Sequence, residues 1–149
     1  MKGLMLKVGV ALVLAVATVA AGVHGLTPIM KVNIPFDFQI KDHQLPAGRY
    51  TVASFNPSML IIRGEENGKG IYFSIYGGKS EPKNRSARLV FRHYGDRYFL
   101  GSLWDGTSVT SMELGKSEAE RKVQAEQRRH LSQDRTAPET VTILGEAGN

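Results

Sequence analysis

The amino-acid sequence predicts an all-β fold: a single antiparallel β-sandwich or small barrel of about seven or eight strands, followed by a charged C-terminal helix and a loose tail. Apolar and polar residues alternate through much of 29–114, which is typical of strands that bury one face. Turn residues interrupt this stretch at short intervals, so consecutive strands form hairpins and an antiparallel sheet. No helical pattern separates the strands, which argues against a parallel α/β sheet.

The composition indicates one folded domain. The chain has 149 residues and no cysteine. The lack of cysteine excludes a disulfide scaffold, a thiol nucleophile and a cysteine-ligated metal centre. Six Phe, five Tyr and one Trp supply bulk for a folded core, so disorder is not expected.

Residues 1–25 have the pattern of a signal peptide. Lys2 and Lys7 precede an uncharged run at 8–22 that is rich in Ala and Val, and small residues follow it. The run is short for a membrane span, so we expect cleavage within 21–25 and a periplasmic or extracellular protein. An uncleaved anchor is the alternative. No second apolar run reaches membrane length, so we expect no membrane span after cleavage.

The charge of the mature chain is mild. The 19 basic residues become 17 once Lys2 and Lys7 are removed, against 14 acidic residues, so the net charge falls from +5 to +3. A charge this small does not favour nucleic acid as a partner.

The β domain is expected over 26–115. Its first strand covers 32–38, where every second residue is apolar. Pro35 cannot donate a ladder hydrogen bond, which places this strand at an edge or marks a bulge. A turn at 45–48 then leads to a strand at 49–55.

Two hairpins follow. The first pairs 59–63 with 71–76 around Asn67 and Gly68, residues that tolerate positive backbone angles. The second pairs 88–94 with 97–104 around Gly95 and Asp96, and its Gly-first tip suits a type II′ turn. A further turn leads into a strand at 107–114.

The alternation of apolar and polar residues ends near residue 115, and the C-terminal part has a helical pattern. Ser117 with Glu120 matches a capping box, and 116–131 is a charged helix with few apolar residues. We expect this helix to be mostly solvated and 132–149 to be a flexible tail, with a short edge strand at 140–144. A chain that ends at Gly115 is therefore expected to fold.

The motifs resemble those of a family of small exported β-rich bacterial proteins. The segments that carry the resemblance are VNIPFDF at 32–38, LPAGRYTV at 45–52, LVF at 89–91 and YGDRYFL at 94–100, with Trp104. The resemblance covers about 30–115 and the charged helix. It implies export and a β-rich domain, and it supplies no activity and no functional residues.

The register of the second hairpin assigns its residues to two faces. The face expected in the core carries Ala87, Leu89, Phe91, His93, Tyr98, Leu100, Ser102 and Trp104. The face expected outside carries Arg88, Val90, Arg92, Tyr94, Arg97, Phe99, Gly101 and Leu103.

The outer face supplies the candidate binding residues, which are Arg88, Arg92, Tyr94, Arg97 and Phe99. Guanidinium groups bind carboxylate, sulfate or phosphate, and aromatic rings stack on sugars. The alternative is an ordinary outer face covered by long arginine stems. If both arginines point outward, replacing Arg88 and Arg92 by Ala leaves stability nearly unchanged.

The sequence favours a non-enzymatic exported domain that binds an envelope component such as an acidic glycan, another anionic ligand, or a protein. His43, His93 and His130 lack the spacing of metal ligands, so we assign no metal, cofactor or catalytic residue. The alternatives are a small barrel that carries an apolar ligand and a hydrolase of envelope material, which needs two converging acids. An assembly role through an exposed edge strand is a further alternative.

Overall fold

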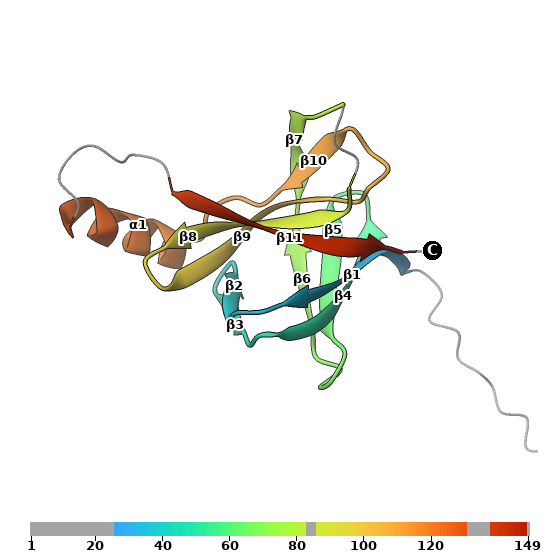
Figure 1. Cartoon of the computed structure of the whole chain (residues 1–149), viewed down its shortest axis with the longest axis horizontal. Helices are drawn as coiled ribbons and strands as arrows, with labels where there is room; N and C mark the ends of the chain where they lie inside the picture. Colours follow the sequence, from blue (N-terminus) through green and yellow to red (C-terminus); the bar gives the residue numbers. More distant parts are fainter. Residues whose placement is uncertain (1–25, 83–85, 131–137, 149) are drawn as a thin grey trace, which may run out of the picture.

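The computed structural model describes residues 26–82, 86–130 and 138–148 (Figure 1). The expected signal peptide at 1–25 lies outside the described residues. The elements are β1 Thr27–Ile34, β2 Phe38–Ile40, β3 His43–Leu45, β4 Gly48–Asn56, β5 Met59–Gly64, β6 Gly70–Ser74, β7 Tyr76–Ser80, β8 Arg88–Tyr94, β9 Arg97–Trp104, β10 Thr110–Glu113, α1 Glu118–His130 and β11 Glu139–Ala147.

The strands form one curled, mixed sheet, a half-barrel with α1 at one end (Figure 1). The strand order is β3-β2-β9-β8-β11-β1-β4-β5-β6, and β10 pairs with both β7 and β9. The β-rich fold is confirmed, but the described residues form eleven strands in a curled half-barrel, not a sandwich or closed barrel of about seven or eight. The expectation of a purely antiparallel sheet is wrong at one contact, because β2 runs parallel to β9 where Gln39 meets Phe99.

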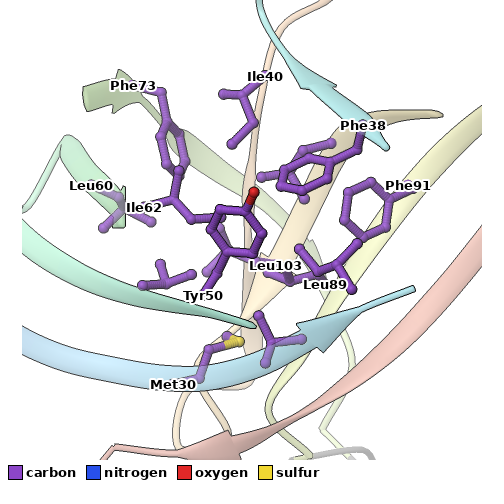
Figure 2. Packing of buried hydrophobic residues seen from close by; sticks show 14 of the residues in the cluster. Met30, Phe38, Ile40, Tyr50, Leu60, Ile62, Phe73, Leu89, Phe91 and Leu103 are labelled. Carbon is purple, nitrogen blue, oxygen red and sulfur yellow. The ribbon is translucent and has the colours of Figure 1, made fainter. Parts of the chain in front are cut away.

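The concave side of the sheet is filled by apolar side chains (Figure 2). The Phe38 ring meets Phe91 and Tyr50 edge-on, with ring centroids 5.5 and 5.2 Å apart. The Tyr50 hydroxyl donates to the Pro46 carbonyl oxygen at 2.6 Å, and burial, followed by the charge of Asp37, raises the pKa of Tyr50. Alternate apolar residues of β1 and β4 enter this core, as the period-two pattern predicts.

Pro35 lies just after the last residue of β1, which pairs with β11 on one side and β4 on the other. The expectation that this strand lies at an edge is therefore wrong. Proline has no N–H to donate, and pairing stops before it, so the chain leaves β1 and starts β2 at Phe38.

The tight turns follow the sequence signals. Gly95 has a φ of +61°, and Tyr94 pairs with Arg97 across a two-residue tip, as predicted. The other hairpin is confirmed, and Gly68 has a φ of +65° in its loop between β5 and β6. The expected turn is wrong in one respect, because the loop spans 65–69 and Asn67 does not have a positive φ. Positive φ is the conformation for which glycine is preferred, so local chemistry specified both turns.

The C-terminal strand is the largest difference from expectation. β11 pairs along 139–144 with β8 and along 145–147 with β1, so it joins two parts of the sheet. The expected strand at 140–144 is confirmed and pairs with β8 on one side, whereas the expected loose tail is wrong for residues 139–147. The predicted helix is confirmed as Glu118–His130, and the Ser117 hydroxyl accepts the Glu120 N–H at 3.1 Å.

Candidate functional site: a groove on the outer face of the sheet

The β8–β9 hairpin positions most of the candidate residues. Its register agrees with expectation from Tyr94–Arg97 to Phe91–Leu100, and a bulge then shifts the pairing. Gly101 lies at this bulge, where an added Cβ would lie 2.8 Å from the Arg92 Nη1 atom.

The bulge moves three side chains to the opposite face. Ser102, which was expected in the core, pairs with Val90 and joins the outer face. Beyond the bulge, Leu89 pairs with Leu103 and Arg88 pairs with Trp104. Leu103 therefore enters the core (Figure 2), and Trp104 leaves it for the face that carries Arg88. The expectation that Trp104 faces the core and Leu103 faces outward is wrong, because one extra residue reverses the alternation.

Helix α1 packs on one end of this outer face. Glu120 of α1 is 2% exposed and forms an ion pair with Arg92, with Arg92 Nη2 2.9 Å from Glu120 Oε2. The Tyr94 hydroxyl donates to Glu120 Oε1 at 3.0 Å. Burial disfavours the charged form of Arg92, but the hydrogen bond and the charge of Glu120 raise the pKa of Arg92. The pKa of Tyr94 is also raised, first by burial and second by the nearby charge of Glu120.

Three candidate binding residues are thus engaged inside the protein. Arg92 is half-buried, and Tyr94 and Phe99 are buried, with their rings edge-on at 5.8 Å. The expectation that all three are exposed on the outer face is wrong, because α1 packs against this end of β8 and leaves only part of Arg92 accessible. Arg97 remains exposed and donates to the Gln39 side-chain oxygen at 3.1 Å. The residue that the sequence reasoning missed is Glu120, which was assigned only to the helix cap.

Arg88 is also held within the protein. It is 5% exposed, its Nη2 lies 2.6 Å from Glu81 Oε2, and its guanidinium carbon lies 3.8 Å from the centre of the Trp104 ring. The expectation that Arg88 is exposed is therefore wrong, so the condition for a nearly neutral replacement of Arg88 and Arg92 by Ala is not met. The Trp104 indole nitrogen is buried and has no hydrogen-bond partner among the described residues.

These strands leave a groove on the outer face, which we call the outer groove. Its volume is about 760 Å³. Its floor follows the sheet register: Thr142 lies opposite Val90, and Val90 lies opposite Ser102. The outer groove is lined by Lys79, Glu81, Ser86, Arg88, Val90, Arg92, Gly101, Ser102, Trp104, Glu113, Pro138, Thr140, Thr142 and Leu144.

A second hollow of about 380 Å³, which we call the side hollow, shares Leu144 with the outer groove. Its other lining residues are Lys31, Val32, Asn33, Arg49, Glu65 and Glu146. Leu144 is 69% exposed, an unusual position for a large apolar side chain at the meeting point of two hollows. Both hollows contain acidic and basic residues, so neither is lined by one sign of charge.

The described residues contain no cluster of three or more His, Asp or Glu side chains that could hold a metal ion. His93 is half-buried; its ring stacks on that of Tyr98 with the centroids 4.3 Å apart, and its Nδ1 lies 3.4 Å from Glu139 Oε2. His43 and His130 are exposed. No helix in the described part of the chain is long and apolar enough to cross a membrane.

Comparison of the chain with protein families, with curated proteins and with solved structures finds no match.

Proposed function

We propose that this protein is an exported, non-enzymatic binding module that holds a segment of a hydroxyl-rich polymer, such as an envelope glycan, in the outer groove. The volume of the outer groove is in the range of known ligand sites, about 300–1,000 Å³. Thr140 and Thr142 line it with exposed hydroxyl groups that donate and accept hydrogen bonds.

One observation carries the proposal: the outer groove and the side hollow meet at exposed Leu144. A ligand long enough to occupy both would run across the strands and cover this side chain. Burial of apolar surface would then add to the hydrogen bonds. A polymer meets this requirement better than a single small molecule.

The charges refine the ligand class. Arg88 already pairs with Glu81, and Arg92 already pairs with Glu120. Their positive charges are thus largely balanced inside the protein, which favours a neutral or weakly charged polymer over a strongly acidic one.

The alternatives find less support. A carrier needs an unfilled interior, whereas the concave side of the sheet holds Phe38, Phe73 and Phe91 (Figure 2). A hydrolase needs two acids converging on one bond, and the acids of the outer groove have other partners: Glu81 binds Arg88 and Glu113 accepts the Ser111 hydroxyl.

The test is binding of the purified protein to fragments of envelope polysaccharides, measured by calorimetry. Leu144→Glu should weaken binding about tenfold, because it replaces the apolar surface under the ligand with a hydrated charge that binding would desolvate. Tyr76→Glu is the matched control, since Tyr76 is 57% exposed and lines neither hollow. Equal affinities for the two variants, or no binding to any fragment, would contradict the proposal.

A further inference from the structure

Strand β6 is an end of the sheet with little protection. It pairs with β5, and no described strand pairs with its other side. Its sequence, GIYFS, has no charge and no proline, the residues that usually block pairing at an edge. By contrast, β3 is only three residues long and polar at two of them, and β7 carries a lysine. Among the terminal strands of the sheet, which are β3, β6 and β7, the unprotected edge is therefore specific to β6.

The open side of β6 presents backbone hydrogen-bonding groups in a fixed order. The Gly64 N–H donates to the Lys69 carbonyl oxygen at 3.1 Å, and the Ile75 N–H donates to the Ser58 carbonyl oxygen at 3.0 Å. Residues of an antiparallel strand alternate between bonding across the ladder and pointing away from it. Lys69 and Ile75 bond across the ladder, and so does every second residue between them. The residues whose N–H and C=O groups point away from β5 are therefore Gly70, Tyr72 and Ser74.

The outer face beside this edge is aromatic. Tyr72 is 53% exposed, and its ring meets that of Phe55 edge-on at 5.5 Å. Ile61 lies opposite Tyr72 in the register and is buried beside this pair. A strand added to β6 would extend this aromatic surface and cover part of it.

We propose that β6 pairs with β6 of a second copy of this chain, antiparallel about a two-fold axis at Tyr72. Such an axis places Tyr72 opposite its own copy and Gly70 opposite Ser74. All three present their backbone groups outward, so the two strands are complementary without a shift in register.

The charge pattern supports a second copy as the occupant. A two-fold axis brings like residues together, and an uncharged strand forms this contact without like-charge repulsion. The two tyrosine rings would meet on the outer face, where aromatic cross-strand pairs are favourable. No residue of β6 lines the outer groove, so this inference is independent of the proposed function.

Sedimentation equilibrium over a range of concentrations tests the inference. The unmodified protein should form dimers. Tyr72→Lys should raise the dissociation constant at least about tenfold, because two lysines face each other at the axis. Tyr76→Lys, the same change at an equally exposed tyrosine of β7, should leave the dimer intact.

Charge reversal makes the test specific. A mixture of Tyr72→Lys and Tyr72→Glu proteins should dimerise again, because opposite charges then face each other. Rescue also shows that neither variant has lost its fold. A protein that stays monomeric at all concentrations, equal loss with Tyr76→Lys, or a mixture that does not dimerise would each overturn the inference. Capture of an extended peptide by a monomeric protein would replace the second copy with a different partner.

Discussion

The packing of α1 on the sheet depends on one buried carboxylate. Glu120 neutralises Arg92 and accepts the Tyr94 hydroxyl, so its loss leaves a half-buried guanidinium without its carboxylate partner. Glu120→Ala should therefore reduce the free energy of unfolding by about 3 kcal/mol. Urea denaturation measures this loss. Glu118→Ala is the matched control in the same helix turn, because Glu118 forms an exposed ion pair with Lys122, and it should cost less than about 0.5 kcal/mol. Similar losses in both variants would show that the Arg92 pair adds nothing specific.

Asp105 gives the stability a defined pH dependence. Burial alone would raise its pKa, but the N–H groups of Ser108 and Thr107 and the Ser108 hydroxyl donate to its carboxylate and lower the pKa. A lowered pKa stabilises the fold above the unfolded-state value, and this contribution disappears as the pH falls below about 4. Asp105→Asn should thus be less stable than the natural sequence at pH 7, and thermal denaturation should show this difference shrinking as the pH falls below about 4. A constant difference across this range would contradict the account.

The sequence predicts single residues well only where their partners are local. Ser117 was correctly assigned to the helix cap, since the cap involves the next few residues. The role of Glu120 was missed because its partner Arg92 is 28 residues away. Trp104 was misplaced for a related reason. At the Gly101 bulge the Arg92 side chain lies over the glycine, and the alternation pattern does not encode this contact or the extra residue.

At the scale of elements, β11 connects the two parts of the sheet. Its residues 139–144 pair with β8, and its residues 145–147 pair with β1. A chain that ends at Gly115 would leave β8 and β1 each with an exposed edge and would remove Glu120 from Arg92. We therefore expect this truncation to unfold or to form a molten state, contrary to the sequence-based expectation.

Near-ultraviolet circular dichroism and amide dispersion in NMR spectra report the outcome of this truncation. Adding a synthetic peptide of residues 138–149 should restore part of the native signal if the strand is required mainly for pairing. A truncated chain with a native spectrum and a cooperative transition would show that β11 is dispensable.

Hairpins were predictable because turn residues specify them locally. Gly95 and Gly68 adopt the positive φ that their sequence signals indicated. The position of β11 was not predictable in the same way, since both of its partner strands, β8 and β1, lie much earlier in the sequence. Thr140 and Thr142 alternate with Val141 and Ile143, which indicates a strand but not its neighbours.

At the scale of the whole molecule, the curled sheet separates two surfaces. The concave side is filled, and the outer side carries the outer groove, the side hollow and the aromatic edge at β6. The all-β class followed from patterning alone, whereas the outer groove is formed by β7, β8, β9, β10 and β11 together and has no local sequence signal.

The measurement that tests the central claim most directly is NMR mapping of a bound polysaccharide fragment on the purified protein. We predict that the amide signals of Thr140, Thr142 and Leu144 shift on titration. The indole signal of Trp104 should shift with them, and it is unambiguous because the chain has one tryptophan. Shifts confined to other surfaces, or unchanged spectra with every envelope fragment at saturating concentration, would contradict the assignment of the outer groove as the binding site.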